Sequence, residues 1–209
     1  MRARKVFVWV LWGVYAGLWI GAVATHYHWC GHDPAWAPPL FLVVASALAA
    51  IASGEAAPVA IFALGGLAAE WIGVHTGLPF GHYRYTAVLG PSVYGVPPDM
   101  ACAWVILLLF ARDLAWRVAS RPIAAAALGA AIMTWIDLLL DPVTTRILGF
   151  WHWEQPGFYF GVPFLNFVGW FAVSALLLAA APKPRARSGA VVAVGASVVA
   201  FFAAVAIVS

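Results

Sequence analysis

Long apolar runs separated by short polar segments make up most of the chain. A helix that crosses a bilayer needs roughly 20 consecutive, mostly apolar residues. Seven runs approach this length, at about 6–24, 36–52, 57–74, 100–116, 122–140, 162–181 and 189–208. The pattern predicts an all-α, polytopic membrane protein with about seven transmembrane helices. No linker or low-complexity tract divides residues 1–209, so we expect a single transmembrane helical domain.

The composition favours the same class of protein. Hydrophobic residues make up 65% of the chain and charged residues 9%. A soluble domain of this length could not carry such a composition without exposing a large apolar surface. The first apolar run is longer than the apolar part of a cleavable signal peptide. We therefore expect a multi-pass protein of the cell membrane in which the first run is retained as a helix.

Basic residues orient the predicted bundle. Of the 11 Lys and Arg residues, nine fall in clusters at 2–5, 112–121 and 183–187, which seven spans place on one side of the membrane. The other side carries only Arg84 and Arg146. Because cytoplasmic loops are rich in Lys and Arg, we expect a cytoplasmic N-terminus. The net charge of +3 therefore reflects topology and does not indicate nucleic-acid binding.

Acidic residues interrupt the apolar pattern near the outer side. Asp137 and Asp141 lie four residues apart in MTWIDLLLDPVTT and so share one helix face. A charge near the bilayer centre costs about 3 kcal/mol or more, so such acids indicate function by default. The predicted topology brings Glu70, in GGLAAEWIGVHTG, and Asp99 to the same leaflet. The two long connections on that side, 77–99 and 142–161, add polar side chains: His82, Arg84, Arg146, His152 and Glu154.

Asp141 has two interpretations. It precedes Pro142, which disfavours a continuing helix, and a carboxylate at a helix C-terminus faces the unfavourable end of the helix dipole. It therefore needs a partner, and Arg84 and Arg146 are available for a structural ion pair. The alternative is a direct chemical role.

The other acids differ in what they favour. Asp137 has no basic residue within a helical turn, and burial favours the protonated acid, so we favour a catalytic role. Glu70 either takes part in the chemistry or forms a hydrogen bond between helices. Asp99 is equally well explained as a helix N-cap, a position that prefers Asp.

Aromatic rings interleaved with glycines fill residues 149–171, GFWHWEQPGFYFGVPFLNFVGWF. Membrane interfaces are rich in Trp and Tyr, which explains part of the pattern. An interfacial belt does not require Asn166 or Trp170 within the following helix, however. Rings that line a pocket would stabilise a cationic intermediate through their faces. Both interpretations apply to different rings.

Metal and retinal sites are not predicted. The segment HYHWCGH contains His26, His28 and His32, and the last two match the HxxxH spacing of di-iron membrane hydroxylases. A di-iron site needs several such clusters, and the remaining histidines are isolated. No lysine falls within a predicted span, so there is no Schiff-base residue for retinal. Cys30 and Cys102 have no CxxC spacing and predict neither a disulfide nor a zinc site.

Three motifs occur in order: LPFGHYRYTAVLGPSVYGVPPDMACAW (78–104), WIDLLLDP (135–142) and GFWHWEQPGFYFGVPFLNFVGW (149–170). Together they resemble the membrane-integral carotenoid hydratases of the CruF type, which include the bisanhydrobacterioruberin hydratases and the lycopene 1',2'-hydratases. The resemblance covers about the central half of the chain. It implies addition of water across the terminal 1',2' double bond of an acyclic carotenoid, giving a tertiary alcohol. It implies no redox cofactor. The implied partners are the carotenoid, water, the lipid bilayer and other enzymes of the carotenoid pathway.

That reaction suggests roles for the residues. Protonation of a trisubstituted alkene gives a tertiary carbocation, which water captures, so the site needs a protonated acid in a low-dielectric environment and rings to stabilise the cation. We assign Asp137 as proton donor, with Asp141 or Glu70 holding that acid or orienting water. Candidates for lining the substrate site are the rings of Tyr83, Tyr85, Trp151, Trp153, Tyr159 and Trp170. Candidates for positioning the water are the polar side chains of His82, Arg84 and Asn166.

Two other functions fit the same residues. A proton-initiated carotenoid cyclase would protonate the polyene end and let an internal double bond capture the cation. A non-catalytic carotenoid- or lipid-binding membrane protein would use the acids only as anchors.

Overall fold

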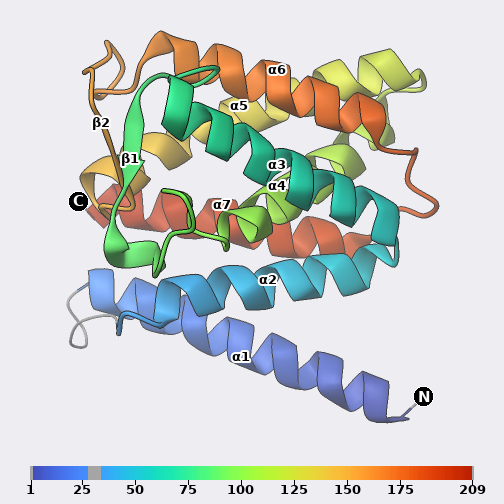
Figure 1. The fold of residues 1–209 in the computed structure, drawn as a ribbon. Helices are drawn as coiled ribbons and strands as arrows, with labels where there is room; N and C mark the ends of the chain where they lie inside the picture. The colour runs from blue at the N-terminus through green and yellow to red at the C-terminus, as the bar shows by residue number, and fades with distance from the viewer. Residues whose placement is uncertain (1, 28–33, 209) are drawn as a thin grey trace.

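A computed structural model describes residues 2–27 and 34–208 of the chain. In this part, seven α-helices form a bundle that carries a small two-stranded sheet at one end (Figure 1). The helices are α1 (Arg2–His26), α2 (Ala37–Ser53), α3 (Ala56–Thr76), α4 (Met100–Val118), α5 (Pro122–Arg146), α6 (Phe164–Ala180) and α7 (Gly189–Val208). The short elements are β1 (Tyr83–Tyr85), the 3-10 helix η1 (Ala87–Leu89) and β2 (Trp151–Trp153). The all-α prediction is confirmed.

Four of these helices are long and apolar enough to cross a membrane: Lys5–His26, Ala56–Thr76, Pro122–Arg146 and Gly189–Ile207. The apolar helices α2 and α6 have 17 residues each, and α4 carries three charged residues. The expected count of seven spans is therefore supported only in part. The start of helix α1 and the α6–α7 connection both lie at the end of the bundle opposite β1 and β2 (Figure 1). The cytoplasmic position of that end stays a prediction.

Helix α4 runs through the centre of the bundle. Its residues from Trp104 to Ala111 are all buried, and it packs against α2, α3, α5 and α7. A helix that is apolar on all sides is expected to be buried in this way. Near its C-terminus, the buried Arg112 pairs with Glu55 at 3.2 Å and also donates to the Pro182 carbonyl oxygen. This buried pair ties α4 to the α2–α3 turn and to the α6–α7 connection.

Helix α5 continues past the point where the sequence predicted its end. It runs to Arg146 with Pro142 inside it. Proline has no N–H to donate to the carbonyl oxygen four residues earlier, that of Leu138. The Tyr159 hydroxyl donates to this oxygen instead, at 3.1 Å. The helix therefore tolerates the proline, and Asp141 lies within α5 and not at its C-terminus.

We expect Tyr159→Phe to lower the free energy of unfolding by about 1 kcal/mol, because the Leu138 carbonyl oxygen loses its donor. Thermal unfolding in one detergent measures the change. Tyr94→Phe is the matched control, because Tyr94 is 80% exposed in a loop. Equal melting temperatures for Tyr159→Phe and the wild type would contradict this account of the proline.

Strands β1 and β2 replace part of the two long connections expected from the sequence. They pair antiparallel, with Tyr83 opposite Trp153 and Tyr85 opposite Trp151. Side chains alternate between the two faces of a strand. The burial pattern follows this alternation, because Tyr83 and Trp151 are buried whereas the central residue of each strand is exposed. The strand pair thus presents four aromatic rings to the bundle at what we call the strand end.

Candidate active site

Three buried carboxyl groups gather between the helices and the strand pair. Glu70 of α3, Asp137 of α5 and Asp141 of α5 are 4%, 0% and 1% exposed. Glu70 and Asp141 line the same small cavity, which Asn166 of α6 also lines. The cavity-lining residues do not include Asp137, whose connection to the cavity runs through Asn166. The convergence of these acids from different helices is the central feature of the site.

Asn166 joins the two aspartates. Its Nδ2 donates to Asp137 Oδ2 at 2.6 Å and to Asp141 Oδ2 at 2.9 Å. Because one nitrogen serves both, the two carboxyl groups lie side by side. Two neighbouring carboxyls in a low-dielectric site cannot both ionise without a large electrostatic cost, so such a pair shares a proton. The geometry thus supplies a buried acid that can give up a proton.

The two aspartates differ in their remaining partners. Asp141 Oδ1 accepts a hydrogen bond from Trp153 Nε1 at 2.9 Å. Asp137 Oδ1 is buried and has no hydrogen-bond partner among the described residues. A buried polar atom without a partner costs roughly 1–3 kcal/mol, which is tolerated most often at functional sites. Among the described residues, the Oδ1 atom of Asp137 therefore lacks the hydrogen bond that a buried carboxyl oxygen normally has.

The proposed ion pair of Asp141 is wrong. Arg84 is 81% exposed and pairs with Glu154. Arg146 lies over the Phe160 ring, 5.3 Å from its centroid. Both arginines are on the outside of the strand end, and Asp141 instead uses the neutral donors Trp153 and Asn166. The longer α5 explains the difference, because it buries Asp141 within the bundle.

Glu70 is held by three neutral donors. Its Oε2 accepts from the Tyr83 and Tyr85 hydroxyls at 2.5 and 2.7 Å, and its Oε1 accepts from Trp104 Nε1 at 2.9 Å. The last contact is the hydrogen bond between helices expected as one alternative. Three donated hydrogen bonds favour the charged form of a carboxyl group, and a negative charge at this place would face positive charge that develops in the cavity.

Two glycines on α3 admit these donors to Glu70. A Cβ at Gly66 would lie 2.2 Å from the Trp104 ring, and one at Gly73 would lie 2.8 Å from the Tyr83 hydroxyl. Both distances are shorter than packed side chains allow. The glycines lie about one helical turn before and after Glu70, on its own face of the helix. The sequence GGLAAEWIG thus leaves room for Trp104 and Tyr83 to reach the carboxyl group.

The two tyrosines stay neutral over the physiological range. Burial raises the pKa of the Tyr83 phenol well above its usual value, and the negative charge of Glu70 raises it further. The same two causes raise the pKa of Tyr85. Because both phenols keep their protons, they act as fixed donors to Glu70 and not as acids.

Aromatic rings wall the cavity. Trp170 lines it and stacks from behind on Trp104, with ring centroids 4.8 Å apart, and Trp153 lies 5.3 Å from Tyr83. The cavity is further lined by Phe80, Tyr85, Met100 and Trp151. It offers about 20 Å³ to the centre of a water molecule, which is enough for about one water. The site therefore combines acids, a place for one water and ring faces suited to a cation.

Not every residue predicted for the site reaches it. His82 and Arg84 are exposed on the outer face of the strand end and line a neighbouring open cleft, on the other side of Tyr83 and Tyr85 from the acids. Tyr159 supports the Leu138 carbonyl oxygen and packs on Phe167. The structure does bring together the other predicted residues: Glu70, Tyr83, Tyr85, Asp137, Asp141, Trp151, Trp153, Asn166 and Trp170.

Sequence reasoning did not assign Trp104, Phe80 or Met100 to the site. Trp104 is the most informative of these, because it donates to Glu70 and stacks on Trp170. A signal for it exists, since a Trp in the middle of an apolar helix needs a partner for its N–H. No group of three or more metal-ligand side chains occurs among the described residues. His28, His32 and Cys30 lie outside those residues.

Asp99 occupies the N-cap position of α4, but its side chain does not cap the helix. It is 9% exposed, and neither carboxyl oxygen has a hydrogen-bond partner among the described residues. Burial raises the pKa of Asp99 to about 6. The expected capping role is therefore wrong, because the side chain makes no capping hydrogen bond, and the nearby N–H groups of Asp99 and Met100 offset only part of the effect of burial on the pKa.

This raised pKa predicts a pH dependence of stability. The folded chain keeps the Asp99 proton to a higher pH than the unfolded chain, in which the pKa is about 3.9. The contribution of Asp99 to the free energy of unfolding is thus most favourable below about pH 4, falls as pH rises towards 6 and is level above. We expect Asp99→Asn to remove this fall and to raise the melting temperature at pH 7. Parallel pH profiles of the variant and the wild type would contradict the assignment.

Comparisons with known proteins place this site in a family. The family model described as carotenoid biosynthesis protein matches residues 39–209. The chain belongs to this family. The match begins within α2, so it includes every residue of the carboxyl cluster and its aromatic wall and leaves α1 outside. The carotenoid biosynthesis proteins thus share the part of the chain that carries the site.

One protein to which the chain is similar is a hydratase. The chain is 38% identical over 110 residues to the bisanhydrobacterioruberin hydratase of Haloarcula japonica. The aligned region covers 48% of this chain and 36% of that protein, so the match spans about a third of the relative's length. These findings confirm the resemblance to the carotenoid hydratases and support a role in modifying carotenoids. No solved structure matches the chain.

Proposed function

We propose that the chain adds water across the terminal 1',2' double bond of an acyclic carotenoid, such as lycopene or a C50 precursor, to give a tertiary alcohol. One observation carries the proposal: an aspartate pair joined by Asn166 adjoins a space for about one water inside a wall of aromatic rings. Similarity to a bisanhydrobacterioruberin hydratase supports the same reaction class. The activity would be that of a carotenoid 1,2-hydratase.

The first step is proton transfer to the alkene. The Asp137–Asp141 pair is the proton source, and Asp141 delivers the proton because it lines the cavity. Asp137, assigned as the direct donor from the sequence, lies beside it behind Asn166, and the repulsion between two neighbouring charges keeps one proton on the pair. The proton forms a C–H bond at the less substituted carbon, and the tertiary carbon becomes a cation. The faces of the surrounding rings and the charge of Glu70 stabilise this cation.

The second step is capture of the cation by water. The water oxygen forms a bond to the tertiary carbon and loses one proton to the aspartate pair, which returns to its starting state. Glu70 orients the water, because its carboxyl oxygens line the same cavity. The net change is addition of one water, with no oxidant or reductant. The substrate end reaches the cavity after the wall side chains rotate, since the space now holds about one water.

The space for water separates the proposal from its alternatives. A cyclase must keep water from its cation, whereas here a water-sized space adjoins the carboxyl groups. A non-catalytic binder has no need for three buried acids with so few donors between them. The related proposals are that residues 1–209 form one domain, that the chain crosses the cell membrane several times and that it acts beside other carotenoid-pathway enzymes.

The purified protein is placed in lipid nanodiscs in buffer made with oxygen-labelled water, and lycopene is added. We expect a more polar pigment with an unchanged visible spectrum, because the terminal double bond is isolated from the conjugated polyene. Its mass increases by one water, and the added oxygen carries the label. The conversion proceeds equally well without molecular oxygen. A product of unchanged mass would favour the cyclase, oxygen dependence would favour a hydroxylase, and unchanged pigment would favour the binder.

A further inference from the structure

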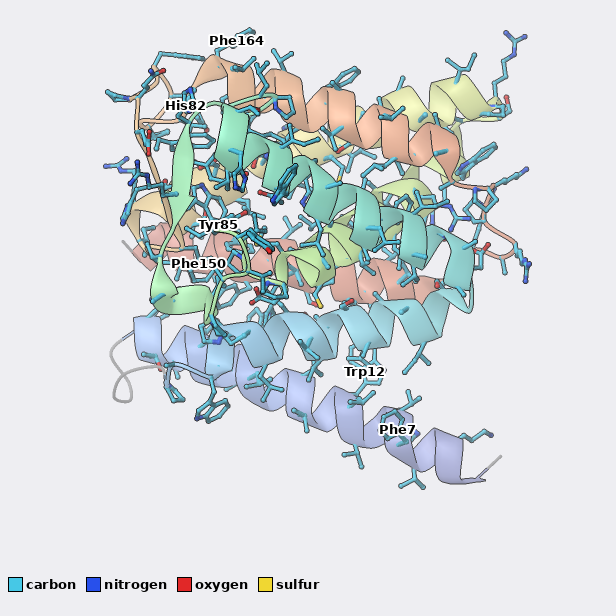
Figure 2. The ribbon with its side chains drawn as sticks, viewed as in Figure 1. Phe7, Trp12, His82, Tyr85, Phe150 and Phe164 are labelled. Carbon is cyan, nitrogen blue, oxygen red and sulfur yellow. The ribbon has the colours of Figure 1, made fainter. Side chains whose placement is uncertain are left out.

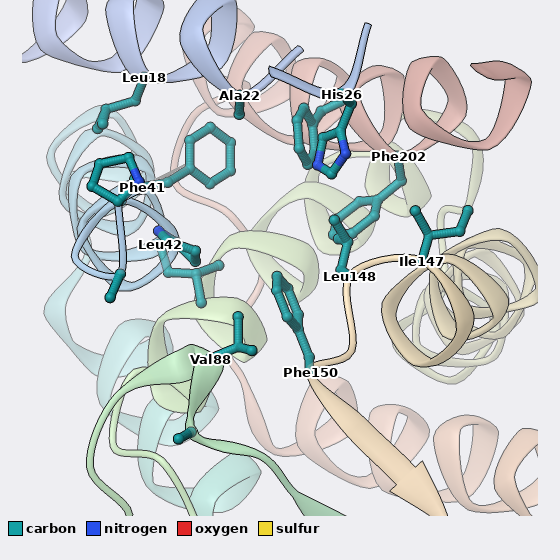
Figure 3. Close-up of a pocket in the computed structure, with 16 residues that line it drawn as sticks. Leu18, Ala22, His26, Phe41, Leu42, Val88, Ile147, Leu148, Phe150 and Phe202 are labelled. Carbon is teal, nitrogen blue, oxygen red and sulfur yellow. The ribbon is translucent and has the colours of Figure 1, made fainter. Parts of the chain in front are cut away.

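A second, larger cavity lies at the strand end of the bundle, between α1, α2, α7 and the segments that follow β1 and α5. Its volume is about 520 Å³, within the range of small-molecule sites. Figure 3 shows Leu18, Ala22 and His26 of α1 on one side and Val88 and Phe150 on the opposite side. No charged side chain occurs among the described residues that line it, and His26 is its most polar one.

A small hydrophobic cluster connects this apolar pocket to the carboxyl cavity. Leu42 and Phe150 line the apolar pocket and pack on the cluster that contains Met100, which lines the carboxyl cavity. The Phe150 ring lies 6.4 Å from that of Trp151, and Trp151 lies 5.9 Å from Tyr85. Figure 2 shows Tyr85 and Phe150 together at the strand end.

The same two chain segments form both cavities. Tyr83 and Tyr85 face the carboxyl cavity, and η1 follows at once to line the apolar pocket with Ala87 and Val88. Asp141 and Trp151 face the carboxyl cavity, and the residues between them line the apolar pocket at positions 147, 148 and 150. A ligand in the apolar pocket would therefore contact the same two segments that contribute side chains to the carboxyl cavity.

The lining favours a flat, apolar ligand. Four phenylalanine rings contribute to it: Phe41, Phe150, Phe201 and Phe202. Ring faces pack on a conjugated polyene over a large area, whereas a flexible acyl chain loses more conformational entropy in a fixed pocket. The described residues that line the pocket carry no charged group, so they provide nothing to bind a phosphate headgroup.

We propose that this apolar pocket binds the isoprenoid chain of the carotenoid substrate and directs its terminal double bond past Phe150 and Met100 to the Asp137–Asp141 pair. The inference rests on the proposed function for the identity of the ligand. Helix α1 forms the outer wall of the pocket although it lies before the family match. Substrate selection in this chain thus depends on α1, which touches none of the catalytic groups.

The test fills the pocket from two sides. Ala22→Phe introduces a ring from α1, and Val88→Trp introduces one from η1. Ala16→Phe is the matched control, because Ala16 is on the same helix, is exposed and does not line the pocket. Each protein is placed in nanodiscs, and bound lycopene is measured by its visible absorbance along with the hydration rate and co-purified phospholipid.

We expect both pocket variants to bind lycopene about tenfold or more weakly, with a higher KM and an unchanged kcat, whereas Ala16→Phe matches the wild type. Weaker binding in both variants with no hydration by any protein would support the pocket and overturn the proposed function. Wild-type binding in both variants would overturn the pocket but leave the function intact. Loss of phospholipid in place of pigment would overturn it too, since the occupant would then be an acyl chain.

Discussion

We expect Asp141→Asn to lower the proposed carotenoid hydration rate by about 10²–10⁴-fold while the protein still folds and inserts. The amide keeps an oxygen that accepts from Trp153 Nε1, and its N–H groups donate to Asn166 once the Asn166 amide turns its oxygen towards them, so the packing around position 141 survives. It has no acidic proton to deliver into the cavity. We expect an effect of the same size from Asp137→Asn, because a neutral side chain at position 137 removes the neighbouring carboxyl that keeps a proton on the pair.

The measurement is the rate of labelled-oxygen incorporation by equal amounts of monodisperse protein. Glu154→Gln is the matched control, because it makes the same chemical change in a partly exposed acid that pairs with Arg84 outside the cavity. We expect this control to keep wild-type activity. Full activity in Asp141→Asn would remove Asp141 as the delivering acid, and full activity in both aspartate variants would remove the pair as the proton source.

The sequence predicted the helices and the gathering of the acids at one end of the bundle, because both depend on patterns that the bilayer imposes. Apolar runs of fixed length predict the helices. The clustering of basic residues predicts which end of each helix faces which side of the membrane. Those two facts alone bring Glu70 and the aspartates to one end of the bundle. The length of α5 was mispredicted, because its continuation past Pro142 depends on a hydroxyl from Tyr159, 21 residues from its acceptor Leu138.

Contacts within the site depend on how each helix is rotated about its own axis. The spacing of apolar residues cannot determine this rotation in helices that are apolar on most sides. Asn166 was a candidate from its polarity alone, but its hydrogen bonds to both aspartates follow from how α6 packs on α5. Trp104 was missed for the same reason, since its indole reaches Glu70 only where Gly66 leaves space.

The strand pair could have been predicted in part. YRY and WHW alternate aromatic and polar residues, which is the period of a strand. Three residues are too few to distinguish this from an irregular loop. The pairing register places the tyrosines and tryptophans inward and Arg84 and His152 outward. That alternation explains why the aromatic candidates reach the cavity and the basic ones do not.

Glu70 offers the test that separates a catalytic charge from a structural acceptor. Glu70→Leu removes the acceptor of three buried donors, those of Tyr83, Tyr85 and Trp104. At roughly 1–3 kcal/mol for each unsatisfied donor, we expect a loss of more than about 3 kcal/mol and little monodisperse protein. Glu70→Gln behaves differently, because its amide oxygen accepts from Trp104 and its amide N–H groups donate to the tyrosine hydroxyls, which rotate to accept.

Glu70→Gln should therefore fold with a nearly unchanged melting temperature but hydrate lycopene about 10²–10³-fold more slowly, because no negative charge faces the cation. Lycopene binding stays at the wild-type level, since the variant leaves the apolar pocket unaltered. The melting temperature, the amount of bound lycopene and the rate of labelled-oxygen incorporation are all measured on one preparation. Wild-type turnover in Glu70→Gln would show that Glu70 is only an acceptor for its three donors, and the aspartate pair would then have to orient the water as well as protonate the alkene.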